Sequence, residues 1–256
     1  MRHLQVDHVY VIHVSSGAEA RAASIERQLA RHGISFEYVL ERDMKDLTRE
    51  WLDQWFGPPM NVVQPRTSCC SKHLVAYQRM LRDGWNDALV LEDDMFLSDD
   101  FVEELNESLK ELRSRPGIRT GAAYISLENS GLRPLSKIAT HEQGVTLYRA
   151  LKGRDTGAYW LTRKSAEQFL HRAETAKISE STPFFQNIVF ESGAVELYWR
   201  HPAIAEQGSH SGKFDSLVTE HRVGRMRRPR WLARKAFQLY LRPFFDWLAG
   251  LAGLAG

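Results

Sequence analysis

Cysteine is almost absent from this chain: only Cys69 and Cys70 occur among its 256 residues, and they are adjacent. Two neighbouring cysteines cannot cross-link a small secreted domain, so a disulfide scaffold is excluded. The pattern is typical of a reduced, intracellular protein, and it favours buried apolar roles for both thiols over a catalytic role.

Long apolar runs are missing too. No stretch of about 18 apolar residues is found, so the sequence predicts no membrane-spanning helix. Residues 1–7 turn polar too soon for a signal peptide. The composition, 43% hydrophobic and 26% charged, is ordinary for a globular protein, and the length fits one large domain or one domain with an extension.

Acidic residues are absent from residues 221–245, which contain eight Arg or Lys, so the formal net charge of +2 leaves −6 on the rest of the chain. A basic end on an acidic body indicates an anionic partner, either a membrane or nucleic acid. No nucleic-acid-binding motif accompanies the charge, so we expect no nucleic-acid partner.

The basic end also has a helical pattern. A helix from Trp231 to Arg242 would place basic residues on one side and large apolar residues on the other, with Phe244, Phe245 and Trp247 beyond its end. This pattern is typical of a helix that lies in the plane of a membrane surface. The alternative is a helix docked on the protein's own acidic body. We therefore divide the chain into a domain of residues 1–220 and a basic amphipathic membrane-association tail of residues 221–256.

The order of hydrophobic patterns predicts an α/β fold. Apolar runs at 9–12 and 36–40 flank helical spacing at 18–32, which is a βαβ unit with parallel strands. Further strands are expected at 88–91, 122–125, 145–148, 158–161 and 195–199, and further helices at 71–81, 99–112 and 163–170. Residues 41–68 and 128–144 lack periodicity and are expected to be irregular.

The most informative segment is the apolar run at 88–91, which ends in three carboxylates, Glu92, Asp93 and Asp94. Such a run indicates a buried strand, and the charges should emerge from the core at its end because buried unpaired carboxylates are costly. Ligands bind at that edge of open α/β sheets, and Mg²⁺ and Mn²⁺ prefer oxygen ligands. The segment predicts a metal or phosphate site. The alternative is an acidic turn that caps the next helix.

Several segments then resemble a known family. Four segments are similar, in chain order, to four motifs of that family. They are the strand at 9–12 with Arg21, the segment 69–74, the segment 88–94 and the segment 157–162. These motifs are an opening strand with an arginine, a Gly-Cys-x-x-Ser-His-Leu helix start, a Val-Leu-Glu-Asp-Asp strand and a Gly-x-Tyr-x-x-Ser joint. Together they resemble glycosyltransferase family 25, the lipopolysaccharide-type β-galactosyltransferases, over roughly residues 8–210.

The resemblance implies a GT-A-like, Rossmann-related mixed sheet with helices on both faces, a nucleotide-sugar donor, and Mn²⁺ or Mg²⁺ as cofactor. Asp94 would coordinate the metal together with Glu92, since alternate residues of an extended chain point the same way. Arg21, Glu92 and Asp93 would contact the donor, and the helix start near Arg21 suits a diphosphate.

The resemblance also implies the reaction. The expected activity is transfer of a sugar, galactose from UDP-galactose, onto a lipopolysaccharide or other lipid-linked saccharide acceptor. Together with the basic tail, this places the protein in the cytoplasm, peripheral on the inner face of a bacterial inner membrane, with the anionic membrane surface as a partner.

The chain departs from the family pattern at two places. Lys72 stands where the family has Ser, and Pro183 is followed by Phe184 and Phe185 where the family often has Pro-x-Asp. Glu180 and Glu191 flank the second departure and are the candidate catalytic bases. The alternative function is a catalytically inactive nucleotide-sugar or saccharide-binding protein of the same fold.

Other candidates have two readings each. In the small-residue loop 208–213, His210 is a third metal ligand or a solvated histidine, and Lys213 is a phosphate contact. Trp51 and Trp55 line a sugar platform or pack in the core. His73 and Asp155 also have two interpretations each. His73 caps or packs at a helix start, or it takes part in the chemistry. Asp155 stabilises a turn, or it binds a sugar hydroxyl.

Overall fold

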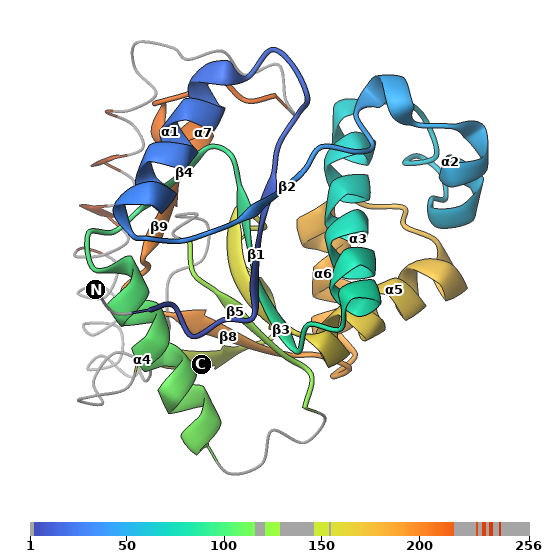
Figure 1. Ribbon diagram of the computed structural model, residues 1–256. Helices are drawn as coiled ribbons and strands as arrows, with labels where there is room; N and C mark the ends of the chain where they lie inside the picture. Colours follow the sequence, from blue (N-terminus) through green and yellow to red (C-terminus); the bar gives the residue numbers. More distant parts are fainter. Residues whose placement is uncertain are drawn as a thin grey trace.

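The computed structural model describes residues 3–115, 121–128, 146–153 and 155–217, and the isolated positions 229, 232, 233, 236, 237 and 241. Its centre is a seven-stranded sheet in the order β2-β1-β3-β7-β5-β8-β6, with a separate two-stranded sheet β4-β9 (Figure 1). The strands are β1 (His8–Ile12), β2 (Glu37–Val39), β3 (Asp87–Glu92), β4 (Met95–Leu97), β5 (Ala123–Ser126), β6 (Leu147–Ala150), β7 (Ala158–Thr162), β8 (Glu196–Arg200) and β9 (Ala205–Gln207).

The helices are α1 (Glu19–Arg31), α2 (Arg49–Trp55), α3 (Pro65–Asp83), α4 (Phe101–Ser114), α5 (Arg163–Ala176), α6 (Thr182–Glu191) and α7 (Gly208–Ser211), with a short 3₁₀ helix η1 (Met44–Asp46). Figure 1 shows α1 and α4 on one side of the sheet and α3, α5 and α6 on the other. The prediction of a mixed α/β sheet with helices on both faces is confirmed.

The parallel half of the sheet is the part that local patterns predicted. β1 pairs with β2 and with β3 in parallel, and α1 connects the first two strands. Side chains of β1 alternate between two cores: Tyr10 and Ile12 pack beneath α3, whereas Val9 and Val11 pack beneath α1 and α4. A strand buried on both faces has no polar alternation, which explains the unbroken apolar runs.

The other half of the sheet has mixed directions. β7 runs antiparallel to both β3 and β5, while β5 pairs in parallel with β8. β6 closes the edge antiparallel to β8. The reversal at β7 brings its first residues beside the last residues of β3, since antiparallel neighbours place opposite ends together.

The segment 41–68 differs from its predicted irregularity. It contains α2, where Thr48 accepts a hydrogen bond from Trp51 N, and the first turn of α3, which starts at Pro65. Trp51 and Trp55 are buried at 7% and 2% exposure, and Trp51 Nε1 donates to Ser71 Oγ at 2.9 Å. Both tryptophans therefore have the core role, and the sugar-platform interpretation is wrong for this structure.

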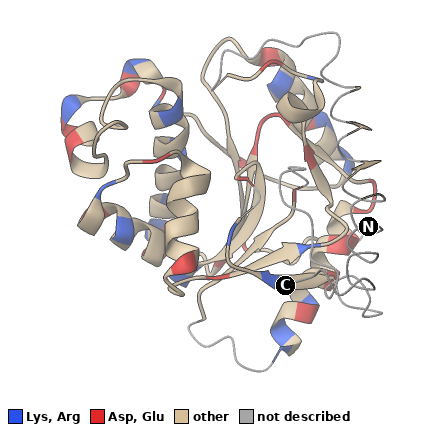
Figure 2. Ribbon diagram, turned by 180° about the vertical axis from the view of Figure 1, so that it is seen from behind, with Lys and Arg blue, Asp and Glu red and all other residues tan. Residues whose placement is uncertain are grey.

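Much of the tail lies outside the described residues, as do residues 129–144 of the segment expected to be a loop. The described tail positions have helical conformation, and Leu232, Phe237 and Leu241 among them are exposed. In the described main body, Lys and Arg are interspersed with Asp and Glu over the helices (Figure 2). No helix among the described residues is both long enough and apolar enough to cross a membrane.

Candidate active site

Two adjoining clefts open at the carboxyl ends of β1 and β3. The first, about 360 Å³, lies over the end of β1, the start of α1 and the start of α3. The second, about 400 Å³, lies between the segment before β7, the start of α6 and the β9–α7 joint. Arg21, Cys69, Glu92 and Leu217 line both clefts and so form the wall between them.

Asp93 faces the first cleft and is fully engaged. Its carboxylate accepts from Arg21 Nη1 at 3.0 Å and contacts His13 Nδ1 at 2.6 Å. Arg21 in turn donates to the carbonyl of Asp215 and lies 3.9 Å from Asp94. The buried guanidinium thus offsets the charge of two neighbouring carboxylates.

Asp94 faces the second cleft and is 1% exposed. Its Oδ2 accepts from Ser209 N at 3.0 Å, whereas Oδ1 is buried and accepts no hydrogen bond from the described residues. Burial raises the pKa of Asp94 to about 6, and the nearby Glu92 carboxylate adds to the rise. An orphaned carboxylate oxygen in a cleft is a natural ligand for a hard cation.

Glu92 also opens on the second cleft. Thr156 Oγ1 and Gln207 Nε2 each donate to one of its oxygens at 3.1 Å, and His73 Nε2 lies 3.5 Å from Oε1. Burial alone would raise the pKa of Glu92, but the neighbouring His73, with Thr156 and Arg21, holds it below its ordinary value. Glu92 is therefore a carboxylate at neutral pH.

The three acids at the end of β3 thus divide between the clefts. Asp94 lines the second cleft, Asp93 lines the first and Glu92 lines both. Asp93 and Asp94 lie in the turn between β3 and β4, so the alternation expected of an extended chain does not apply to them. The expectation that these charges emerge from the core is wrong for Asp93 and Asp94, which are 4% and 1% exposed. They tolerate burial because Arg21, His13 and the Ser209 amide face them.

A chain of buried hydrogen bonds supports Glu92 from below. His73 Nδ1 contacts Tyr159 OH at 2.7 Å, and Tyr159 OH contacts Tyr77 OH at 2.9 Å. Gln186 Nε2 donates to Tyr77 OH at 2.8 Å, and its amide oxygen accepts from Tyr124 OH at 3.1 Å. Each hydroxyl of the chain finds an acceptor when the hydrogen bonds run from Tyr124 toward His73, which leaves Nε2–H 3.5 Å from Glu92 Oε1.

A second polar cluster forms the floor of the first cleft. Lys72 Nζ donates to Leu40 O at 2.8 Å and Glu41 O at 2.9 Å, and lies 2.8 Å from Asp43 Oδ1. Asp43 also accepts from the amide and hydroxyl of Ser15. Lys72 is 2% exposed, and these three acceptors compensate its buried charge.

Further acids surround the second cleft. Burial raises the pKa of Asp155 to about 6; the neighbouring His210, 3.7 Å away, opposes the rise and Glu92 adds to it. Burial, reinforced by Asp155 and Glu92, raises the pKa of Glu128 well above its ordinary value. Carboxyl groups gathered this closely repel one another, and a divalent cation among them would relieve the repulsion.

Two glycines allow this packing. A Cβ on Gly157 would lie 2.6 Å from Met95 Sδ and 2.9 Å from Glu128 Oε2. A Cβ on Gly208 would lie 2.8 Å from the carbonyl oxygen of Asp94, which accepts from Gly208 N at 2.8 Å. At Gly208 the backbone of Asp94 leaves no room for a side chain, whereas a side chain at Gly157 would require Met95 and Glu128 to move.

Comparison with known families identifies the chain. The model of glycosyltransferase family 25, described as an LPS biosynthesis protein family, matches residues 6–182, which include the β1–α1–β2 unit and the end of β3. The chain belongs to glycosyltransferase family 25. Comparison with curated proteins gives no match.

Solved structures resemble this family 25 chain at low identity. A197 from STIV is 11% identical, with a TM-score of 0.40, over 77% of this chain and 83% of that chain. A glycosyltransferase involved in glycosylation of the major capsid of PBCV-1 is 10% identical, with a TM-score of 0.40, over 78% and 94%. Drosophila beta-1,4-galactosyltransferase 7, solved with manganese, UDP-Gal and xylobiose, is 12% identical, with a TM-score of 0.37, over 76% and 66%.

Of the other candidate residues, His210 lies at a cleft, whereas Lys213, Glu180 and Glu191 do not. His210 lines the second cleft, and its Nδ1 is buried with no hydrogen-bond partner among the described residues. Lys213 instead lies 3.6 Å from the Phe96 ring and 3.8 Å from Glu206, away from both clefts. Glu180 is exposed just before the start of α6, and Glu191 lies at its far end, 2.9 Å from Lys152.

The sequence interpretation missed several cleft residues. Asp43 and Gln207 have no motif that marks them, because each meets the site through a contact between distant parts of the chain. Lys72 was noted only as a departure from a motif. Asp155 was noted only for its place beside Gly157. His73 lies inside α3 rather than at its start, since α3 begins at Pro65.

Proposed function

We propose that this family 25 glycosyltransferase moves a sugar, galactose from UDP-galactose, onto a lipopolysaccharide or other lipid-linked saccharide in a reaction that depends on Mn²⁺ or Mg²⁺. One observation carries the proposal beyond the family. The end of β3 faces two adjoining clefts, with Asp93 in one, Asp94 in the other and Glu92 lining both, so a donor and an acceptor would meet at these acids.

The first cleft suits the nucleotide part of the donor. It lies at the carboxyl ends of parallel strands β1 and β3, where α/β sheets bind nucleotides. Arg21 reaches the wall between the clefts and is the cation best placed for a diphosphate. Asp93 and His13 hold its position, so the arginine is set before the donor binds.

The residues of the second cleft fit the metal that the family implies. Asp94 offers a buried, unpartnered Oδ1, Glu92 offers a carboxylate, and His210 offers a buried Nδ1 without a partner among the described residues. A bound Mn²⁺ or Mg²⁺ would neutralise the charge that develops on the departing diphosphate. Thr156, Gln207 and the Ser209 amide orient the two carboxylates for this role.

The second cleft also suits the acceptor. Its walls include Phe184 and Pro183 at the start of α6, where an apolar sugar face can pack. A transfer that inverts the anomeric carbon needs a base for the acceptor hydroxyl. Asp155 lines this cleft, whereas Glu180 and Glu191 do not. We therefore place the base role on Asp155 ahead of the two glutamates.

Donor hydrolysis tests the function. Full-length protein is incubated with a panel of UDP-sugars in Mn²⁺ or in EDTA, and release of UDP is measured. We expect release that requires the metal and is fastest with UDP-galactose. Asp94→Ala should abolish Mn²⁺-dependent UDP binding in calorimetry, while Asp99→Ala, which changes an acid with 88% side-chain exposure, should leave it intact. UDP binding to Asp94→Ala at the wild-type affinity in Mn²⁺ would contradict the metal assignment.

The basic tail supplies the proposed membrane contact. Eight cationic residues and an apolar face suit an anionic leaflet, where each cation contributes about 1 kcal/mol. Full-length protein should sediment with vesicles that contain anionic lipid and stay in solution with neutral ones, and added salt should weaken binding. A chain truncated after Glu220 is the control and should stay in solution with both. Equal sedimentation of both proteins would contradict the tail's role.

A further inference from the structure

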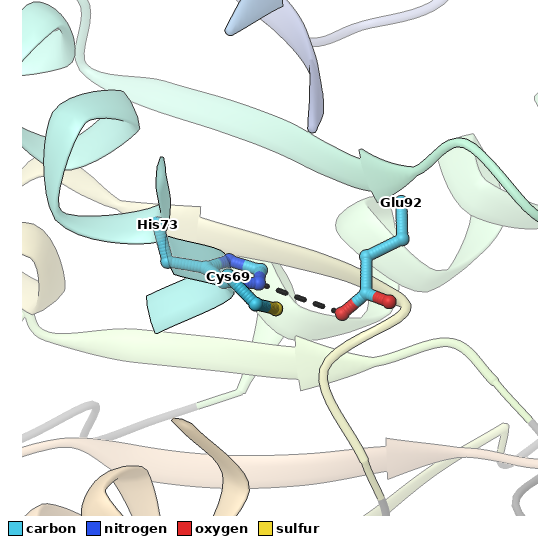
Figure 3. Close-up of side chains that lie close together, drawn as sticks. All are labelled: Cys69, His73 and Glu92. Carbon is cyan, nitrogen blue, oxygen red and sulfur yellow. Dashed lines mark ion pairs between the residues drawn. The ribbon is translucent and has the colours of Figure 1, made fainter. Parts of the chain in front are cut away.

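Two side chains that the donor chemistry does not require, Cys69 and His73, meet Glu92 at the wall between the clefts. Cys69 and His73 are four residues apart on α3 and so lie on one face of the helix, and Glu92 reaches them from the end of β3. One ligand atom from each lies within 4.8 Å of the other two. Figure 3 shows the thiol and the imidazole directed toward the carboxylate.

We propose that Cys69, His73 and Glu92 form a second cation site, which takes a thiophilic transition-metal ion such as Zn²⁺. Sulfur, imidazole nitrogen and carboxylate oxygen are the ligands that Zn²⁺ uses in proteins, and three of them leave a fourth position open. That position faces the clefts, because Cys69 and Glu92 line both of them.

The spacing of the nitrogen and oxygen ligands suits one ion. His73 Nε2 and Glu92 Oε1 are 3.5 Å apart, close to the separation of about 3.3 Å between two ligands bound tetrahedrally at about 2.0 Å from zinc. His73 Nε2 is buried, and that atom has no hydrogen bond within the described part of the chain. A cation between the two atoms would satisfy both.

The surroundings already hold the ligands in place. Tyr159 OH contacts His73 Nδ1 at 2.7 Å and fixes the ring, while Thr156 and Gln207 hold the carboxylate of Glu92. Such outer contacts to ligating histidines and carboxylates are the usual support of zinc sites. To bind a metal, the neutral imidazole must change tautomer: Nε2 gives its hydrogen to water, and Nδ1 takes one up from water and donates it to Tyr159 OH. The buried hydrogen-bond chain must then run from His73 to Tyr124. Rotation of the hydroxyls and of the Gln186 amide permits that reversal.

Binding must also displace a proton from sulfur. Burial raises the pKa of the Cys69 thiol well above its ordinary value, so the metal-free protein holds a thiol. As the S–Zn bond forms, the thiol proton passes to the buffer, and no electron is transferred. Affinity should therefore increase with pH, because each bound ion releases a proton.

The site would act as an inhibitory switch, a consequence that rests on the proposed function. Mn²⁺ and Mg²⁺ prefer the oxygen ligands around Asp94 over a thiol. Glu92 belongs to both ligand sets, so a thiophilic ion that holds Glu92 withdraws it from the donor's metal. Zn²⁺ should therefore inhibit a Mn²⁺-supported reaction.

Cobalt provides a readout that does not depend on activity. Metal-free full-length protein is titrated with Co²⁺, and the sulfur-to-cobalt charge-transfer band in the near ultraviolet is recorded. We expect the band in wild type, its loss in Cys69→Ser, and its retention in Cys70→Ser. Cys70 is the matched control because it is 1% exposed and packs in the core beneath α3. Zn²⁺ should displace the Co²⁺, and its affinity for Cys69→Ser should fall by about 100-fold or more.

The same variants separate this site from the proposed function. Absence of the band in wild type, or an equal band in Cys69→Ser, would overturn the zinc site even if the enzyme is fully active. Inhibition by Zn²⁺ is then compared with each variant's own zinc-free rate, and the inhibition constant should rise at least about tenfold in Cys69→Ser. If no UDP-sugar is turned over, the proposed function fails while the cobalt spectrum still decides the site.

Discussion

Lys72 offers a sharp test of how this chain tolerates a buried charge. Its ammonium group lies within 2.9 Å of three acceptors, two carbonyls and the Asp43 carboxylate, and it is 2% exposed. Lys72→Met keeps most of the apolar stem and removes the charge. The Asp43 carboxylate, 8% exposed, then retains only the hydrogen bonds from Ser15.

The expected loss follows from those contacts. Removing one partner of a buried ion pair costs about 3–5 kcal/mol because it leaves the other charge uncompensated. The Ser15 hydrogen bonds keep Asp43 partly satisfied, so we expect about 3 kcal/mol. For a chain of this length the melting temperature falls by about 2–4 °C per kcal/mol, so Lys72→Met should melt roughly 6–12 °C lower. Lys45→Met, an exposed lysine beside the same cleft, is the control and should change stability by about 0.5 kcal/mol or less.

The pH dependence of this loss has a defined sign. Burial alone would raise the pKa of Asp43, but Lys72 and Ser15 hold it below its ordinary value. In wild type Asp43 therefore contributes stability that is present above its unfolded pKa and is lost as pH falls through the lowered folded pKa. In Lys72→Met the Asp43 carboxylate has lost its charge partner, so protonation of Asp43 instead stabilises the folded protein.

Urea unfolding followed by circular dichroism measures both effects. The free-energy gap between wild type and Lys72→Met should be widest at neutral pH and should narrow as pH is lowered toward about 4. A gap of less than about 1 kcal/mol at pH 7, or one that widens on acidification, would refute the assignment of Lys72 as the charge partner of Asp43.

Three further predictions concern the acids of the two clefts. Asp94→Asn should raise the melting temperature in EDTA, because it removes a buried and poorly partnered charge. It should also abolish the rise in melting temperature that Mn²⁺ produces in wild type. A melting temperature below that of wild type in EDTA would contradict this reasoning. Asp93→Asn should do the opposite and cost on the order of 3 kcal/mol, because it removes the nearest charge partner of the buried Arg21, as thermal unfolding can check. Asp155→Asn should lower kcat by about 100-fold or more with little change in the KM for donor, whereas Glu191→Gln should leave both near wild type; equal losses would move the base away from the second cleft.

Local pattern determined the part of this protein that is continuous in sequence. The apolar run at 88–91 and its three acids predicted the strand and its end, because these depend only on local hydrophobicity, whereas the turn at Asp93 and Asp94 replaced the expected alternation. The βαβ unit at the start of the chain followed from periodicity in the same way. The motifs around Arg21, His73 and Glu92 occur in the family's order along the chain, and this order indicated the family.

Tertiary structure alone decided which side chains complete the site. His13 meets Asp93 across 80 residues, and Ser209 meets Asp94 across 115. No local period encodes such contacts, since they follow from how β1 and β9 are placed against the end of β3. The burial of Asp94, the compensation of Lys72 and the meeting of Cys69 with Glu92 arise for the same reason: the fold removes these groups from water and supplies their partners from distant parts of the chain.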